Sequence, residues 1–217
     1  MAVFETPGLR EFLRNYPKMA IRPSAGGHLR LKGSFEFAAH HAKEGDLQDS
    51  FVLEIIVPCA FPKALPSVTE TGGKIPRTPE YHVNQTGYTL CLGFPLSLLL
   101  KFSKKPTLDG FAENCLVPYL FAISRKLKAG GSFPFGELAH GQAGILSDYA
   151  RLFGLKEAKK VGYVLELLGI KKRRANKLPC PCGCRNRLGR CKFNLRLREF
   201  RSLASRSWFR RERLGLR

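Results

Sequence analysis

Two prolines, Pro62 and Pro66, stand four positions apart between two stretches with the pattern of β-strands, and this spacing restricts the fold more than any other feature of the chain. Proline lacks an amide proton and fixes φ, so neither a helix nor a central strand runs through such a segment. We therefore expect a stiff, extended crossing that starts at Phe61 and re-enters the sheet at Val68. Residues 72–79 hold two glycines and two prolines and predict a second irregular crossing. Long ordered crossings of this kind are often functional.

The patterns on either side of the crossing are those of an antiparallel sheet followed by helices. Residues 29–37 alternate between apolar and polar, which is typical of a half-buried strand. Residues 51–57 are more continuously apolar and predict a second, more buried strand, whereas the polar residues 38–49 predict a loop. Thr6 followed by Pro7 predicts a short helix ahead of the sheet. Apolar residues at helical spacing predict further helices over residues 96–100, 107–130, 137–153 and 156–168, so the expected fold class is α+β.

The charge of the chain is concentrated at one end. The 217 residues carry a net charge of +20, and residues 171–217 hold 17 Lys/Arg against 2 Asp/Glu, which leaves only +5 for residues 1–170. We therefore expect one soluble domain over residues 1–170 and a basic tail over residues 171–217. Such asymmetry favours an acidic partner, most often nucleic acid, over a tail with no fixed partner. No apolar run is long enough for a membrane span and no secretory signal is visible, so we expect a cytoplasmic protein without membrane contact.

Residues 81–95 hold the first candidate site. Cys91 follows His82 and Asn84 after a glycine turn, and a lone thiol preceded by imidazole and amide donors suits acyl-thioester chemistry. The alternative is a buried cysteine at a strand end, since free cysteine packs as a small apolar residue. The chain has seven cysteines, of which four crowd into residues 180–191. An odd count with this spacing favours a reducing compartment and a metal site over a disulfide framework.

The ordered set of motifs resembles the ubiquitin-conjugating enzymes over about residues 6–130. Phe61-Pro62-x-x-x-Pro66-x-Val68 is similar to the aromatic-Pro-x-x-x-Pro-x-Val crossing of that fold. His82-Val83-Asn84 is similar to its His-Pro-Asn signature, and Leu90-Cys91-Leu92 to its active-site strand end. The chain departs from the family in four places. Valine replaces the signature proline, the interval from His82 to Cys91 is one residue shorter, the stretch from Pro66 to His82 is longer, and the stretch after Cys91 is apolar. These departures resemble divergent bacterial relatives from ubiquitin-like and antiphage (CBASS-type) operons.

The resemblance implies a UBC-like fold with an N-terminal helix, an antiparallel sheet and C-terminal helices. It implies that Cys91 accepts the C-terminal carboxyl of a ubiquitin-like protein, or of a nucleotidyltransferase, from an activating enzyme and passes it to an amine. Asn84 would then be the amide that stabilises the oxyanion; alternatively, its side chain fixes the loop. His82 is expected to hold the loop. Two other functions stay open: a catalytically inactive binding module, and a nucleic-acid-binding protein that acts through its tail.

The four clustered cysteines form the second candidate site. Cys180, Cys182 and Cys191 match the spacing of the SEC-C motif, the short zinc motif of the bacterial secretion ATPase, but Lys192 stands where the last ligand is expected. Cys184 supplies a fourth thiolate, and four thiolates suit a closed structural Zn²⁺ site. The alternative is a reduced basic tail with incidental cysteines. The seven apolar residues beyond the cluster alternate with arginines and predict a basic amphipathic helix that contacts nucleic acid or an acidic protein groove: Phe193, Leu195, Leu197, Phe200, Leu203, Trp208 and Phe209.

Overall fold

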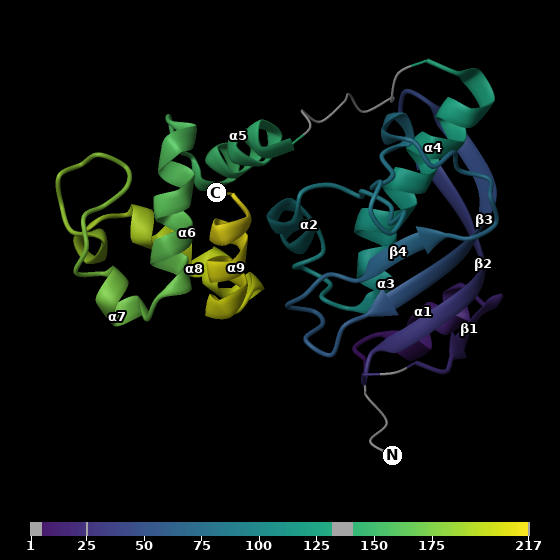
Figure 1. Cartoon of the computed structure of the whole chain (residues 1–217), viewed down its shortest axis with the longest axis horizontal. Helices are drawn as coiled ribbons and strands as arrows, with labels where there is room; N and C mark the ends of the chain where they lie inside the picture. Colours follow the sequence, from purple (N-terminus) through teal and green to yellow (C-terminus); the bar gives the residue numbers. More distant parts are fainter. Residues whose placement is uncertain (1–5, 25, 132–140, 217) are drawn as a thin grey trace. The chain divides into compact units, whose positions relative to one another are not determined.

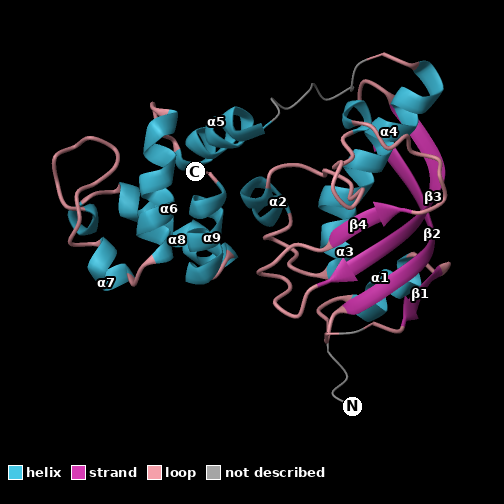
Figure 2. Cartoon of the chain, in the orientation of Figure 1, coloured by secondary structure: helices cyan, strands magenta, loops and turns pink. Residues whose placement is uncertain are grey.

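The computed structural model describes residues 6–24, 26–131 and 141–216, and it has an α+β fold (Figure 1). The chain forms two compact units. The first contains Met1–Gly93 and Lys101–Glu137, and the second contains Phe94–Leu100 and Leu138–Arg217. The described strands all belong to the first unit, whereas the second is helical (Figure 2). Within the described part of the chain, the helices are too short or too polar to cross a lipid bilayer.

The first unit is built on a four-stranded antiparallel sheet in the order β1-β2-β3-β4. The strands are β1 (Met19–Arg22), β2 (Leu29–His41), β3 (Gly45–Val57) and β4 (Ser67–Glu70). The predicted alternation of β2 is confirmed, since Leu31, Phe35 and Phe37 are buried. Strand β3 alternates in the same way, and Phe51 lies opposite Phe35 in the register. One face of the sheet therefore faces the core and the other is more exposed, as is common for antiparallel sheets.

The predicted loop over residues 38–49 is wrong, because these residues extend the hairpin. Strand β2 continues to His41, β3 begins at Gly45, and the ladder joins them without a break. The polar side chains of His40, Asp46 and Gln48 lie on the exposed face, whereas Leu47 is buried on the other face, so much of this hairpin has the composition of a loop. Strand β1 is an addition to the predicted elements. It pairs with β2 at Gly33, where an added Cβ would lie 2.0 Å from the carbonyl oxygen of Lys18.

Helices cover one face of this sheet. Helix α1 (Leu9–Asn15) places Phe12 against Phe35, with ring centroids 6.3 Å apart. Thr107 caps α3 (Leu108–Phe111), since its Oγ1 accepts a hydrogen bond from the Gly110 amide at 3.0 Å. A π-helical turn (Ala112–Leu116) then leads into α4 (Val117–Ala129), which packs against β2 and β3. The crossing after β3 contains neither helix nor strand over residues 58–66, as predicted. It is not extended, because residues 59–64 form turns and bends in which the Phe61 amide donates to the Pro58 carbonyl oxygen at 2.9 Å.

The second unit is a helical assembly that includes most of the basic tail. Its helices are α2 (Pro95–Lys101), α5 (Gly141–Phe153), α6 (Val161–Gly169), α7 (Lys172–Ala175), α8 (Phe193–Leu203) and α9 (Arg206–Gly215). Short 3₁₀ turns at Ala158–Lys160 and Leu188–Arg190 connect them. The Tyr149 hydroxyl accepts a hydrogen bond from the Leu96 amide (3.3 Å) and donates one to Glu212 (2.6 Å), so it joins α2, α5 and α9. Residues 137–140 of the helix predicted over residues 137–153 lie outside the described residues.

The division into units differs from the expected boundary at residue 170. Helix α9 packs along α6, and the Arg213 guanidinium lies 2.8 Å from the Glu166 carboxylate. Arg210 also donates to the Gly169 carbonyl oxygen at 3.1 Å. The charge asymmetry predicts a separate tail, but apolar side chains spaced among the arginines place the tail in the same unit as α5 and α6. The single amphipathic helix expected here is two helices, because Ser205 caps α9 after a break at Ala204.

Candidate functional sites

The loop that carries Cys91 is fixed to the edge of the sheet by backbone hydrogen bonds. Isolated bridges join Thr69 of β4 to Thr89, and Val83 to Leu90. The Leu90 amide donates to the Val68 carbonyl oxygen at 2.8 Å, and the Cys91 amide donates to the His82 carbonyl oxygen at 2.7 Å. The loop is therefore a small hairpin-like element attached to β4.

Helix α4 holds the same loop from the other side. The Tyr119 hydroxyl donates to the carbonyl oxygen of Tyr81 at 2.8 Å, and Lys126 donates to that of Glu80, also at 2.8 Å. Burial raises the pKa of Tyr119, and the neighbouring Cys91 and Glu70 raise it further, so the phenol stays protonated as a donor. Sequence reasoning missed Tyr119, because nothing in the spacing of the chain links α4 to this loop.

The thiol of Cys91 is half-buried, unlike that of Cys115, which is 2% exposed in the core of the first unit. Burial raises the pKa of Cys91 above its usual value, and a hydrogen bond from the Gly93 backbone partly offsets this. Burial raises the pKa of Cys115 to about 12. Cys91 is thus mainly a neutral thiol at neutral pH, and its activation as a nucleophile requires removal of a proton.

The two polar residues upstream of Cys91 lie in the same loop. His82 has a left-handed backbone (φ 51°), and its carbonyl oxygen accepts the hydrogen bond from Cys91. Asn84 is exposed, and its Nδ2 donates to Thr89 Oγ1 at 2.9 Å, while its backbone amide donates to the Thr89 carbonyl oxygen, also at 2.9 Å. In this structure the Asn84 side chain therefore fixes the loop, which is one of the two roles the sequence left open.

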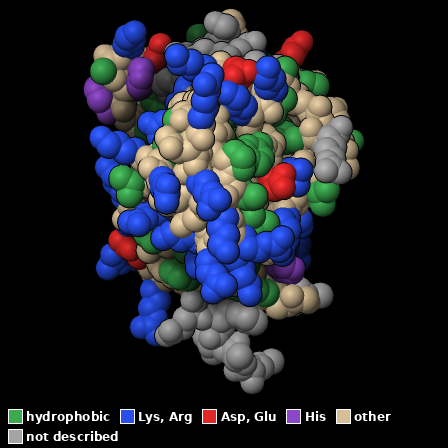
Figure 3. Space-filling view, turned by 90° about the vertical axis from the view of Figure 1, so that its left-hand side faces the viewer, with side chains coloured by type: hydrophobic (Ala, Val, Ile, Leu, Met, Phe, Trp, Pro, Cys, Tyr) green, Lys and Arg blue, Asp and Glu red, His purple; other side chains and the backbone are tan. Residues whose placement is uncertain are grey.

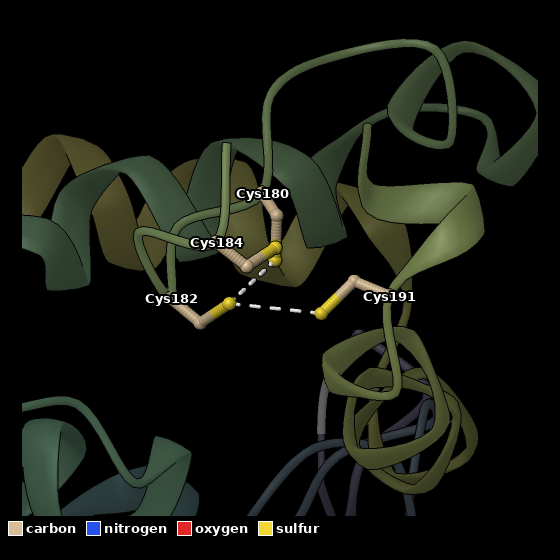
Figure 4. Close-up of side chains that lie close together, drawn as sticks. All are labelled: Cys180, Cys182, Cys184 and Cys191. Atoms are coloured by element: carbon tan, nitrogen blue, oxygen red, sulfur yellow. Dashed lines mark hydrogen bonds between the residues drawn. The ribbon is translucent and has the colours of Figure 1, made fainter. Parts of the chain in front are cut away.

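The four cysteines of the second site converge as the spacing predicts (Figure 4). The sulfur atoms of Cys180, Cys182, Cys184 and Cys191 all lie within 4.8 Å of one another. Cys180 and Cys182 are 3.2 Å apart at sulfur, and Cys182 and Cys191 are 3.6 Å apart. A tetrahedral ion with metal–sulfur bonds of about 2.3 Å separates its sulfur ligands by about 3.8 Å. The cluster could therefore hold a metal ion after a small rearrangement.

Short backbone pairings bring the two arms of the cysteine loop together. Pro179 and Arg187 form a bridge, the Cys180 amide donates to the Asn186 carbonyl oxygen at 2.9 Å, and the Leu188 amide donates to that of Leu178 at 2.8 Å. The Tyr163 hydroxyl of α6 donates to the Pro179 carbonyl oxygen at 2.9 Å and ties the loop to the unit. Leu188 is the main buried apolar residue of this loop.

Backbone amides also point at the sulfur atoms. The Phe193 amide donates to Cys191 Sγ at 3.4 Å. A hydrogen bond from the Asn186 backbone lowers the pKa of Cys184 to about 7, whereas burial raises the pKa of Cys180. Amide donors of this kind orient thiolate ligands and stabilise their negative charge, so the supporting hydrogen bonds needed by a metal site are in place.

No protein-family model, curated protein or solved structure matches this chain.

Proposed function

We propose that the first unit is a ubiquitin-conjugating-type transferase that carries a protein C-terminus as a thioester on Cys91. The observation that supports it most is a half-buried thiol at the end of a loop that is bonded to β4 and held by α4. The order of elements supports it as well, because a helix and a four-stranded antiparallel meander precede the cysteine, with the proline crossing between β3 and β4. The donor would be an activating enzyme, and the cargo a ubiquitin-like protein or a nucleotidyltransferase C-terminus in a bacterial conjugation or antiphage system.

The proposed chemistry has two steps. In the first, Sγ of Cys91 forms a bond to the carrier's carboxyl carbon, the bond to the activating enzyme's thiol breaks, and the Cys91 proton passes to that leaving sulfur. In the second, an amine nitrogen forms an amide bond with the carboxyl carbon, and the carbon–sulfur bond breaks. The amine proton returns to Cys91.

Replacing Cys91 with Ala is expected to abolish a reductant-sensitive adduct. The assay supplies a ubiquitin-like protein ending in Gly-Gly as a small-molecule thioester, so the unknown activating enzyme is not needed. Cys91→Ser should form an ester that survives reductant, because an oxygen ester resists thiols. Cys59→Ala is the matched control, since Cys59 is an exposed thiol outside the loop. An adduct that persists in Cys91→Ala but disappears in Cys59→Ala would exclude the proposal.

A pair of substitutions separates the two roles of Asn84. If Asn84 only fixes the loop, Thr89→Val removes the acceptor of its side-chain bond and should slow acyl transfer as much as Asn84→Ala does. If Asn84 stabilises the oxyanion, Asn84→Ala should cost roughly a hundredfold to a thousandfold and Thr89→Val far less. Single-turnover transfer from the loaded protein to free lysine measures both. Equal rates in all three proteins would remove Asn84 from the mechanism.

The alternative function is a binding module that has lost the chemistry. The raised pKa of Cys91 and the engagement of Asn84 with Thr89 favour it. It predicts that the thioester probe leaves no adduct on the unaltered protein and that iodoacetamide modifies Cys91 no faster than Cys115. Rapid modification of Cys91 together with adduct formation would exclude it.

For the second unit we propose that the four cysteines hold a structural Zn²⁺. Four thiolates in a closed arrangement are typical of structural zinc, which would lock the two arms of the loop together. No open position remains for a substrate, so the ion would contribute to folding and not to catalysis.

A further inference from the structure

The segment around the cysteine cluster has an extreme composition. Residues 171–192 contain nine Lys/Arg and no Asp/Glu. All nine side chains are exposed: Lys171, Lys172, Arg173, Arg174, Lys177, Arg185, Arg187, Arg190 and Lys192. We call residues 171–192 the basic segment. Its two arms lie side by side, because the Gly189 amide donates to the Asn176 carbonyl oxygen at 3.0 Å and the Leu188 amide donates to that of Leu178.

The fold does not use these cations. Within the described residues, none of the nine takes part in an ion pair. The arginines of α8 and α9 differ, since Arg196 donates to the Phe153 carbonyl oxygen at 3.0 Å and Arg213 pairs with Glu166 at 2.8 Å. Folding thus concentrates like charges in the basic segment without neutralising them, which costs stability unless a partner compensates. Figure 3 shows a face on which Lys and Arg side chains are far more numerous than Asp and Glu.

The side chains of the basic segment suit phosphate groups better than a protein groove. Protein interfaces have an apolar centre and are depleted in lysine. The exposed large apolar side chains in the described part of the chain all lie outside the basic segment: Ile21, Val52, Tyr88, Leu195 and Leu214. Interfaces with nucleic acid are polar and strongly positive. A segment with exposed cations and no exposed apolar anchor therefore favours a nucleic acid.

The composition of the basic segment also limits which parts of a nucleic acid it can contact. The basic segment contains no Phe, Tyr or Trp, so it offers no ring on which a base can stack. Two of the four aromatics of the tail, Phe200 and Phe209, are buried within the second unit, and the half-buried Phe193 and Trp208 lie outside the basic segment. A divalent ion with four thiolates has a charge of about −2, which still leaves about +7 on the segment.

We propose that the basic segment, residues 171–192, binds the phosphate backbone of RNA or DNA without sequence preference. The cysteine cluster holds the two arms together so that cations from both arms lie along one nucleic-acid backbone. This activity is separate from the thioester chemistry of Cys91. It places the nucleic-acid contact in the cysteine loop and α7, and not in the arginine and aromatic pattern of α8 and α9.

The test measures how tightly the full chain binds two labelled nucleic acids as the salt concentration is raised. One is a single-stranded RNA of about 20 nucleotides and the other is a DNA duplex of about 20 base pairs. If about six cations contact phosphates, the affinity should fall roughly 10³-fold between about 50 and about 200 mM salt. Two sequences of equal length should bind within about twofold of each other, because phosphates carry no sequence information. Comparing the affinities for the RNA and for the DNA duplex identifies which backbone the protein prefers, and a preference for either one supports the proposal.

Matched variants locate the contact. Arg173→Gln/Arg174→Gln/Lys177→Gln should weaken binding roughly tenfold or more and flatten the log–log salt dependence by about 1 per lost contact. Arg10→Gln/Lys63→Gln/Lys104→Gln removes the same charge from exposed positions of the first unit and should stay within about twofold of the unaltered protein. Arg187→Gln/Arg190→Gln tests the other arm if the first variant misfolds, and circular dichroism checks all three.

Three outcomes would overturn the proposal. One is no binding of either nucleic acid at low salt, and another is an equal loss in the control variant. The third is binding to polyglutamate or to anionic vesicles that nucleic acid does not displace, which would indicate an acidic protein or a membrane surface. The result does not depend on the thioester proposal, because Cys91→Ala should bind nucleic acid as the unaltered protein does.

Discussion

If the four cysteines hold a zinc ion, as we propose, its removal is expected to unfold the cysteine loop and to lower the stability of the whole second unit. Besides its cysteines the loop buries the apolar side chains of Leu188 and Pro181, a small core, so ligand bonds would supply most of its folding free energy. Structural zinc sites in small peptides contribute about 10–16 kcal/mol, which exceeds what such a loop gains from packing. Elemental analysis of the purified protein should find about one zinc per chain. A chelator should lower the temperature at which the second unit unfolds, because it removes a ligand that binds only the folded state.

Substitution of single ligands gives the same test without a chelator. Cys182→Ser and Cys184→Ser should each lose bound zinc and unfold at a lower temperature, because a closed site needs all four thiolates. Cys59→Ser is the control, since that exposed thiol lies outside the cluster and donates only to the Gly27 carbonyl oxygen, at 3.0 Å. Protein that contains no zinc, keeps four reactive thiols and melts unchanged in chelator would refute the metal site. Iron in place of zinc would retain the site and change its identity.

The sequence was most informative where spacing along the chain corresponds directly to position in space. The four cysteines lie within 12 consecutive residues, so a short loop suffices to bring them together, and Cys184 joins the others as predicted. The alternation of β2 is also a local feature and is confirmed. The proline crossing lacks helix and strand as predicted, but its backbone turns where an extended chain was expected. The assignment to the ubiquitin-conjugating family stays a prediction, because it depends on short motifs with departures.

The features that escaped prediction depend on tertiary contacts. The Tyr119 hydroxyl donates a hydrogen bond to the Tyr81 carbonyl oxygen in the Cys91 loop, and the two residues lie 38 positions apart. No local sequence pattern predicts this contact. The hairpin over residues 38–49 resembles a loop in composition, because His40, Asp46 and Gln48 lie on its solvated face. Strand β1 forms because Gly33 lets the chain approach closely, and a glycine in a strand can equally mark a bulge or a bend.

The tail is the clearest example of a feature that the sequence pattern alone does not predict. Aromatic residues among arginines predict contact with bases or with an acidic groove, but Phe200 is only 2% exposed and its ring lies 4.9 Å from that of Phe153 in an edge-to-face arrangement. An amphipathic pattern indicates that one face is apolar and does not indicate what covers it. Here the cover is α5 and α6 of the same unit, so the arginines of α8 and α9 act partly as structural donors.

Phe200→Ala is therefore expected to destabilise the second unit by about 3–5 kcal/mol, because it removes a buried ring and leaves a cavity beside Phe153. Leu195→Ala is the matched control on the same helix, since Leu195 is 57% exposed and its loss should cost less than about 0.5 kcal/mol. Urea unfolding of the full chain measures both. If α8 were a free nucleic-acid-binding helix, the two variants would unfold alike and Phe200→Ala would weaken nucleic-acid binding instead. A large stability loss with unchanged binding by the folded protein would assign Phe200 to the core and leave phosphate contact to the basic segment.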